Sequence, residues 1–318
     1  MREIRNTKVC VAGGAGFLGS HLVDHLIDDR NCEVLVLDNL ISGKEKFIHK
    51  KAKFIHFDIT GSESELRTIL AENMIEYVFN YVAEPYIPVS FKRPLHVFNT
   101  NAMGALKLIN AAHDTGVKGI LQVSSAEIYG AIDGKISEEA KTEPHSSYGA
   151  SKLAIDCMVQ SAWKERKVPA IAMRQFNCYG TRETHEYIIP VIIEQLAKRN
   201  CVYLGNNSSR DFQFAKDAVR MAVELLEKGE FGEVYNMGSE NTIQIYDLAL
   251  LIGQLMGHEK IEIIEDEKRK RPWEIWHLQS DNTKLYKTID ARPETPFDEG
   301  LLETINDYKK NSWSYISN

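Results

Sequence analysis

The chain has 318 residues, of which 43% are hydrophobic and 26% charged, and its formal net charge is −7. This composition is that of an ordinary globular protein and argues against a disordered chain, a collagen or a coiled coil. The negative charge and the lack of a basic tract argue against a nucleic-acid partner.

In the first half of the chain, short apolar runs alternate with longer segments whose apolar residues recur every three or four positions. The runs predict strands and the longer segments predict core-facing helices. The expected strands are Val9–Ala12, Glu33–Leu37, Phe54–Phe57, Tyr77–Phe79, Ile120–Val123 and Ala170–Met173. The expected helices are Phe17–Leu26, Glu63–Leu70, Leu95–Ala112 and Tyr148–Trp163. This alternation predicts a Rossmann-type, doubly wound α/β fold, with a parallel sheet and helices on both faces.

After Gly180 the alternation is less regular. The expected helices are Ile188–Lys198, Ala215–Glu227, Ile245–Met256 and Phe297–Lys309, and the expected strands are Cys201–Leu204 and Val234–Asn236. We interpret this part as a smaller C-terminal α/β lobe that binds the substrate and closes over the sheet. The predicted division is residues 1–180 for the cofactor and 181–318 for this lobe. No linker rich in Pro, Gly or Ser separates the two, so we expect them to be interleaved.

A glycine-rich turn follows the first expected strand, with Gly13, Gly16 and Gly19. In such turns one glycine permits a tight bend, one lets the main chain approach a pyrophosphate, and one lets the helix pack on the strand. The helix that begins at Phe17 and Leu18 then offers N–H groups and a positive dipole end to phosphates. The spacing G-x-x-G-x-x-G differs from G-x-G-x-x-G in its first interval, so the turn alone is weak evidence for a dinucleotide site.

The second expected strand leads into Asp38 and Asn39, about 20 residues after the turn. A carboxylate there can accept hydrogen bonds from both ribose hydroxyls and would repel a 2′-phosphate, which favours NAD over NADP. Asp38 could instead cap its own loop. Asp58 and Ile59, after the third strand, could meet the adenine, although a plain strand-end aspartate is nearly as well supported.

Tyr148 and Lys152 are spaced to lie on one face of a helix. Removal of hydride from an alcohol carbon requires a base for the hydroxyl proton. We expect the Lys152 ammonium to lower the pKa of the Tyr148 phenol and to hold the nicotinamide ribose. Ser124 and Ser125 end the preceding strand, where Ser125 can share the hydrogen bond of the substrate hydroxyl or merely cap the loop. Together these residues predict redox chemistry at a carbinol.

Several segments, in this order, resemble those of the extended short-chain dehydrogenases/reductases, and among them the nucleotide-sugar epimerases and dehydratases. They are Gly13–Gly19, Asp38–Leu40, Asn101–Gly104, Ser124–Gly130, Ser147–Lys152, Arg174–Gly180, Arg210–Phe212 and Arg271–Pro272. The resemblance covers nearly the whole chain. It implies NAD as cofactor and a hydride-transfer site formed by Tyr148, Lys152 and Ser125. It also implies substrate contacts from Asn177, Arg210 and Arg271, with the arginines meeting the diphosphate.

The resemblance implies a common first step, in which hydride leaves C4 of a hexose carried on a nucleoside diphosphate. Glu127 favours a 4,6-dehydratase, because dehydratase-like members carry a glutamate there that removes the C5 proton. Ala126 argues against it, because dehydratases commonly carry at this position an aspartate that protonates the departing hydroxyl, or a serine. Glu127 could also be a surface residue of an ordinary turn. We therefore rank a 4,6-dehydratase first, a 4-epimerase second and a C4 dehydrogenase that stops at the 4-keto sugar third.

Other readings are weaker. Decarboxylation would require a uronic acid and an arginine for its carboxylate, and nothing singles out Arg93 or Arg182 for that role. Asn80 stands where epimerases commonly carry histidine and looks closer to GDP-mannose 4,6-dehydratases, which hints at a GDP-sugar beside UDP- or dTDP-sugars. A non-enzymatic module that keeps NAD as a structural ligand is also conceivable. The combined presence of a serine, a tyrosine and a lysine at the expected places argues against it.

The five scattered cysteines lack a C-x-x-C pair, so we expect reduced thiols and no metal site. No run is apolar enough to cross a bilayer, and no cleavable signal precedes the first strand, which predicts a cytoplasmic protein without a membrane partner. By family resemblance, the helices Leu95–Ala112 and Tyr148–Trp163 are expected to form the interface of a homodimer.

Overall fold

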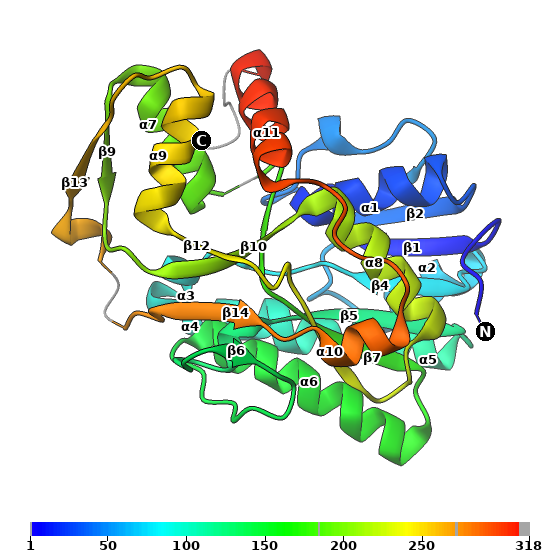
Figure 1. The fold of residues 1–318 in the computed structure, drawn as a ribbon. Coiled ribbons are helices and arrows are strands. Elements are labelled where there is room, and N and C mark those ends of the chain that lie inside the picture. Colours follow the sequence, from blue (N-terminus) through cyan, green and yellow to red (C-terminus); the bar gives the residue numbers. More distant parts are fainter. Residues whose placement is uncertain (1, 184, 271–272, 312–318) are drawn as a thin grey trace.

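Seven parallel strands form the main sheet of the chain, in the order β11-β7-β5-β4-β1-β2-β3 (Figure 1). The structure is a computed structural model that describes residues 2–183, 185–270 and 273–311. The strands are β1 (Lys8–Ala12), β2 (Glu33–Asp38), β3 (Lys53–His56), β4 (Tyr77–Asn80), β5 (Gly119–Ser125), β7 (Ala170–Gln175) and β11 (Val234–Met237). The predicted Rossmann-type fold is confirmed, and its first six strands lie where the apolar runs placed them.

Helices cover both faces of this sheet (Figure 1). One face carries α1 (Phe17–Asp28), α8 (Ala215–Lys228) and α10 (Thr283–Thr288), and the other carries α2 (Glu63–Glu72), α5 (Gly104–Asp114) and α6 (Ser147–Arg166). Successive strand residues point to opposite faces. Thus Val9 and Val11 pack with the first group of helices, whereas Cys10 and Ala12 pack with the second. A sheet buried on both faces explains why its strands are apolar throughout.

The chain returns to the main sheet after residue 180. β11 pairs with β7, so that Val234 lies opposite Ala172 and Met237 opposite Gln175, and α8 packs beside α1. We expected this helix and strand in the smaller lobe, and that placement is wrong. The apolar residues of α8 and the side chains of Tyr235 and Met237 are buried in the core of the main sheet. The division into two parts at residue 180 stays a prediction. Residues from before 180 join the smaller lobe at β6, and residues from after 180 join the main sheet at α8 and β11.

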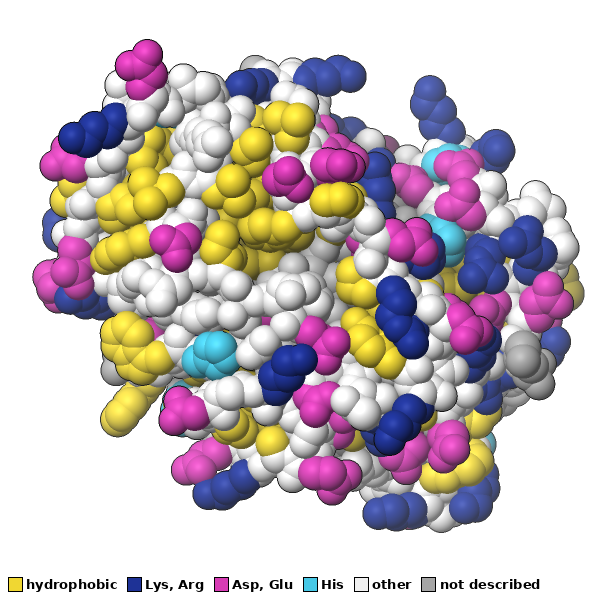
Figure 2. Space-filling model, viewed as in Figure 1, with side chains coloured by type: hydrophobic (Ala, Val, Ile, Leu, Met, Phe, Trp, Pro, Cys, Tyr) yellow, Lys and Arg dark blue, Asp and Glu magenta, His cyan; other side chains and the backbone are white. Residues whose placement is uncertain are grey.

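A smaller lobe is built on short strands. β12 (Thr242–Gln244), β10 (Ser209–Phe214), β14 (His277–Ser280) and β6 (Lys135–Ile136) pair in this order, and β8 (Asn177–Tyr179) joins β10. β9 (Cys201–Leu204) and β13 (Glu262–Glu265) form a separate pair. α7 (Ile188–Lys198), α9 (Ile245–Leu255) and α11 (Phe297–Asn311) enclose the core of the lobe. Hydrophobic side chains gather over α9 and its neighbours in Figure 2, and charges of both signs are interspersed elsewhere on that face.

The helix expected at Leu95–Ala112 is interrupted. α3 (Ile87–Lys92) and α4 (Pro94–Phe98) lead into a π-helical turn at Asn99–Met103, after which α5 begins. In this turn, Asn101 Oδ1 accepts a hydrogen bond from Glu84 N at 2.7 Å, and its Nδ2 donates to Ser151 Oγ at 3.0 Å. The turn therefore ties the loop after β4 to helix α6. Insertions of this kind are frequent near functional sites.

Within the described ranges, no helix combines the length and apolar character needed to cross a membrane. The five cysteines are free thiols.

Candidate active site

A cavity of about 660 Å³ lies at the carboxyl ends of β1, β4, β5 and β7, where the smaller lobe faces the main sheet. Open α/β sheets bind their ligands at this edge, and the volume suits a small-molecule site. Most of the site residues predicted from the sequence line this cavity. They are Gly13, Gly16, Phe17, Leu18, Gly19, Ser124, Ser125, Glu127, Tyr148, Lys152, Asn177 and Arg210.

Four predicted cofactor residues are not part of this lining. Asp38 ends β2, the Nδ2 atom of Asn39 donates to Asp58 Oδ2 at 3.0 Å, and Ile59 packs in the core. Ser42, four residues after Asp38, does line the cavity, so the cavity ends beside this group. Their contact with the adenosine stays a prediction, and the predicted substrate residue Arg271 lies outside the described residues.

The glycine turn has the close approaches that require glycine. Gly13 has φ +80°, and a Cβ atom there would lie 2.8 Å from the carbonyl carbon of Tyr81. A Cβ atom on Gly19 would collide with the carbonyl oxygen of Gly13. Gly16 caps α1 without any side-chain hydrogen bond, and the first turn of this helix holds no acidic residue. The exposed backbone and the helix N-terminus fit the pyrophosphate of NAD.

Asp38 holds this turn in place. Its Oδ2 accepts a hydrogen bond from Ala15 N at 3.0 Å, and its Oδ1 accepts one from Leu40 N at 2.9 Å. Burial raises the pKa of Asp38, while these two backbone donors oppose the shift. The loop-capping role is thus observed. Each carboxylate oxygen retains a second lone pair, so the ribose contact remains open to Asp38.

The N-terminal part of α6 brings Tyr148 and Lys152 to the cavity. Tyr148 is 8% exposed and is hydrogen-bonded to Ser125. We expected Lys152 to lower the pKa of Tyr148, but burial raises this pKa, and the negative charge of Glu127 adds to the shift. The Lys152 Nζ donates to the carbonyl oxygen of Val123 at 2.9 Å and lies 5.8 Å from the centre of the tyrosine ring. The ammonium is therefore anchored to the strand rather than to the phenol.

The pKa of Lys152 also depends on its surroundings. Burial lowers its pKa to about 8, and the carboxylate of Asp156, one turn further along α6, opposes this shift. Asp156 also bonds to Arg174 on β7. A carboxylate thus helps to keep a buried ammonium charged at neutral pH.

Glu127 lies in a short 3₁₀ turn, Ala126–Ile128, directly after β5. Its backbone N–H donates to Ser125 Oγ at 3.2 Å, and a Cβ atom on Gly149 of α6 would lie 2.7 Å from its carbonyl oxygen. This close contact positions the turn against α6, and its carboxylate is near enough to Tyr148 to raise the pKa of the phenol. Ala126 is buried in a small core cluster, where it supplies only a methyl group.

The two described substrate candidates, Asn177 and Arg210, differ in their surroundings. Asn177 begins β8, and its buried Oδ1 has no hydrogen-bond partner among the described residues. Arg210 on β10 forms a 2.7 Å ion pair with Glu274, and both side chains are about one-tenth exposed. This ion pair could not be expected from the sequence, because the two residues are far apart along the chain.

Other residues that line the cavity were not predicted. They include Gln175 at the end of β7, Cys178 within β8, Glu183 and Tyr187 in the segment before α7, and the basic run Lys268–Lys270. The position of Gln175 and Cys178 beside Asn177 was one signal available in the sequence. Gln175 Oε1 and Glu183 Oε2, like the amide oxygen of Asn177, are buried without a hydrogen-bond partner in the described part of the chain. Such atoms mark a place for a polar ligand.

The residues considered for decarboxylation and for a GDP-sugar are not in the lining of this cavity. The Asn80 side chain is bonded to Gln122 and to the backbone N–H of Val82, so its amide is used within the sheet edge. Arg182 forms a 2.7 Å ion pair with Asp24 of α1. Arg93 lines a separate surface groove. Among the residues that the structure describes, no three His, Cys, Asp or Glu side chains are grouped as metal ligands.

Comparisons with known proteins agree with this geometry. Residues 9–238 match the sequence model described as "NAD dependent epimerase/dehydratase family". The dTDP-D-glucose 4,6-dehydratase of Mus musculus is 30% identical over 323 residues, which cover 96% of this chain and 89% of that protein. The structure of the UDP-glucose 4-epimerase of Thermotoga maritima with UDP-glucose has a TM-score of 0.89 at 27% identity, covering 96% of this chain and 99% of that one. The dTDP-glucose 4,6-dehydratase of Streptomyces venezuelae, with NAD bound, has a TM-score of 0.87 at 26% identity, covering 96% and 97%.

Proposed function

Because the chain belongs to the NAD-dependent epimerase/dehydratase family, we propose that it is a 4,6-dehydratase of a hexose carried on a nucleoside diphosphate. Family membership confirms the resemblance seen in the sequence, and with it NAD as the cofactor. What we propose beyond family membership is the overall reaction, the roles of individual side chains and the identity of the sugar.

In the proposed first step, Tyr148 receives the proton of the C4 hydroxyl, and Ser125 shares the hydrogen bond of that hydroxyl. When bound, NAD would supply the acceptor for the hydride of C4 and a positive charge. A positive charge in this cavity would offset the burial and the negative charge of Glu127 that raise the pKa of Tyr148. Lys152, charged at neutral pH, orients the nicotinamide ribose by hydrogen bonds.

One observation carries the choice of dehydration: the carboxylate of Glu127 shares the cavity with Tyr148 and influences its pKa. Oxidation at C4 acidifies the proton on C5, and a carboxylate within reach can then remove it. A 4-epimerase needs only the return of hydride to the other face of the ketone. It has no use for a second base beside the first.

A sugar nucleotide also fits the rest of the cavity. Asn177 Oδ1 offers an acceptor to the hydroxyls of a sugar. Arg210 and the basic run Lys268–Lys270 supply positive charge for a diphosphate. The named relatives act on or bind UDP- or dTDP-sugars, so we propose a pyrimidine nucleotide. The Asn80 amide, which had hinted at a GDP-sugar, is engaged with Gln122 instead.

Epimerisation remains the second candidate. Ala126 cannot donate a proton, and the epimerase of Thermotoga maritima matches the fold over nearly the whole chain. A C4 dehydrogenase that releases the 4-keto sugar is the third candidate. A non-enzymatic module would bind NAD without reducing it when a sugar nucleotide is added.

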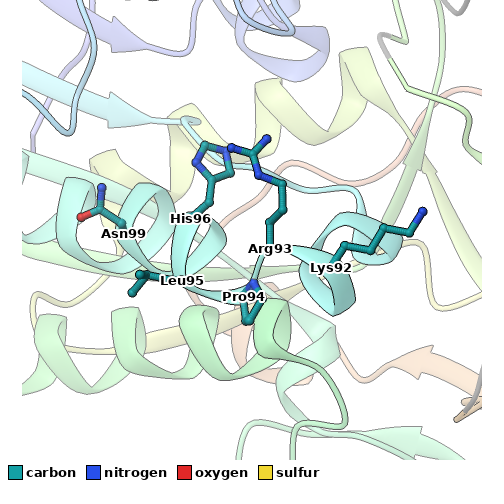
Figure 3. A pocket seen from close by; sticks show the side chains of 6 residues that line it. All are labelled: Lys92, Arg93, Pro94, Leu95, His96 and Asn99. Carbon is teal, nitrogen blue, oxygen red and sulfur yellow. The ribbon is translucent and has the colours of Figure 1, made fainter.

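We also propose a homodimer. α4 packs on α6, and Leu95 of α4 is 83% exposed, while Phe98 and Met103 are about two-fifths exposed. Leu95 lines a surface groove together with Arg93 and His96, whose side chains point in the same direction in Figure 3. An apolar face of this kind, on two packed helices, suits a second copy of the chain.

The function is tested by incubating the purified protein with UDP-, dTDP-, GDP- and CDP-hexoses and measuring the product masses. Loss of one water from the sugar supports dehydration. Loss of two hydrogens would assign C4 oxidation, and an unchanged mass with a new sugar in the NMR spectrum would assign epimerisation. If no sugar nucleotide reduces the bound NAD, the enzymatic proposal fails.

A further inference from the structure

One acidic side chain of the cavity, that of Glu183, has neither a charged partner among the residues described by the structure nor a role in the steps proposed above. Four described glutamates line it: Glu127, Glu183, Glu186 and Glu274. Glu127 lies beside Tyr148, Glu274 is paired with Arg210, and Glu186 is exposed to solvent. Glu183 is 3% exposed, and its Oε2 has no hydrogen-bond partner within the described ranges. A buried carboxyl that is left unpaired is costly and calls for a reason.

The segment that carries Glu183 is fixed at its start. The Thr181 carbonyl oxygen lies 3.0 Å from His21 Nε2, and Arg182 is paired with Asp24 at 2.7 Å, so α1 holds both residues that precede Glu183. Arg182 has φ +65°, a left-handed backbone conformation. The position of the Glu183 carboxyl is thus a property of the fold and not of a loose loop.

Glu183 lines the same cavity as Tyr148 and Glu127. When ionised, Glu183 and Tyr148 each raise the pKa of Tyr187. Tyr187 is therefore an electrostatic neighbour of both. No cation is among the causes that shift the pKa of Glu183, which burial alone raises well above its ordinary value. This direction favours the protonated carboxyl, which is the form that can donate a proton.

We propose that Glu183 is the general acid that protonates the departing C6 hydroxyl of the sugar. This inference rests on the proposed 4,6-dehydratase function, because an epimerase loses no hydroxyl. Hydroxide is a poor leaving group, so the elimination requires an acid at C6 as well as a base at C5. Ala126, next to the proposed base, has no proton to give.

The proposed step balances within the cavity. Glu127 takes the proton from C5 of the 4-keto sugar, and the electrons of that bond form a double bond between C5 and C6. The bond from C6 to oxygen breaks, and Glu183 gives its proton to this oxygen, which leaves as water. C6 then receives the hydride first taken from C4, and Glu127 returns its proton to C5. Glu183 recovers a proton from solvent.

The test compares two substrates in wild-type protein and in Glu183→Gln. One is the dTDP- or UDP-hexose that loses water, and the other is its 6-deoxy-6-fluoro analogue, because fluoride leaves without a full proton transfer. For Glu183→Gln we expect elimination of water to slow by about 100-fold or more, the usual contribution of a general acid. Elimination of fluoride, reduction of NAD and deuterium exchange at C5 are expected to stay near the wild-type rates.

Two further measurements support this comparison. Glu194→Gln, on the helix after the same segment and paired with Lys198, serves as a control and is expected to leave both eliminations unchanged. In the wild-type protein, the rate with the hydroxyl substrate relative to the fluoro substrate should fall as pH rises and Glu183 loses its proton. This pH profile needs no variant, so it applies even if Glu183→Gln does not fold.

Equal slowing of both substrates in Glu183→Gln, or a pH-independent ratio in the wild-type protein, would overturn the assignment of Glu183. These outcomes leave the 4,6-dehydratase function intact, because wild-type protein still yields the dehydrated sugar. If wild-type protein eliminates nothing from any sugar nucleotide, the proposed function fails, and the role of Glu183 fails with it.

Discussion

The Nε atom of Arg174 donates a hydrogen bond of 2.7 Å to Oδ2 of Asp156, and the two side chains are 6% and 2% exposed. The pair joins β7 to α6 within the protein interior. Its carboxylate also opposes the burial that lowers the pKa of Lys152. The charge of Lys152 therefore depends on Asp156, which lies one turn further along α6 and is paired with Arg174.

Asp156→Asn is expected to destabilise the fold by about 3 to 5 kcal/mol, because it leaves the Arg174 guanidinium buried without a counter-charge. Urea unfolding followed by tryptophan fluorescence measures the loss. The double variant Asp156→Leu, Arg174→Met should recover part of it, since both charges are then absent. A single variant as stable as the wild-type protein would contradict this account of the pair.

Tyr148→Phe is expected to abolish reduction of NAD by a sugar nucleotide, with a loss of about 100-fold or more, because the C4 proton then has no acceptor. The absorbance of reduced nicotinamide in a single turnover measures this rate. NAD affinity should be nearly unchanged, since the variant keeps the ring and removes only the hydroxyl. Tyr246→Phe, in the smaller lobe, is the control, and a Tyr148→Phe protein with wild-type turnover would remove Tyr148 from its role.

Glu127→Gln is expected to lose deuterium exchange at C5 while C4 oxidation survives, because glutamine cannot accept the C5 proton. NMR of sugar nucleotide incubated in deuterated buffer follows the exchange, and absorbance follows the oxidation. Removal of the negative charge should also ease deprotonation of Tyr148, so C4 oxidation is expected to reach its maximum at a lower pH. Exchange at the wild-type rate would exclude Glu127 as the base.

His21 is expected to make the fold sensitive to acid. Burial lowers its pKa to about 4, against an ordinary value of 6.5. In the unfolded chain His21 binds a proton below pH 6.5, whereas in the folded chain it does so only below about pH 4. The free energy of unfolding therefore falls as the pH falls through this window. The contribution is about 3 kcal/mol over the window. In His21→Gln the dependence on pH should flatten by this amount, and parallel curves for variant and wild type in urea unfolding would count against it.

Leu95→Asp is expected to convert the proposed dimer to monomers, because it places a charge in the middle of the apolar face on α4. Light scattering after size-exclusion chromatography gives the mass. Leu250→Asp is the matched control, since Leu250 is also half exposed or more but lies on α9. A wild-type protein that is monomeric at micromolar concentration refutes the dimer proposal.

The sequence predicted the main sheet well, because strands buried on both faces are apolar throughout and are separated by amphipathic helices. It also predicted the shared face of Tyr148 and Lys152 on α6, because the two residues are one turn apart and local spacing is kept on folding. The short strands β8, β10, β12 and β14 were missed, because their three to six residues mix polar and apolar side chains and resemble loops.

Contacts between distant segments account for the rest. Nothing near Arg210 in the chain indicates its ion pair with Glu274, and nothing near Lys152 indicates that the Val123 carbonyl holds its ammonium. The effect of burial on the pKa of Tyr148 likewise depends on residues that the fold assembles. Most of the predicted site residues line one cavity, while their charges and partners required the structure.

The passage from β10 into α8 has a mechanical consequence. Phe214 ends the strand in the smaller lobe, and Ala215 begins the helix on the main sheet, with no residue between them to act as a joint. β11 also returns to the main sheet and pairs with β7. The smaller lobe and the main sheet are therefore joined by the chain at several points. Rotation of one lobe on the other as a rigid body would break these crossings, so we expect the two parts to keep one relative orientation when ligands bind.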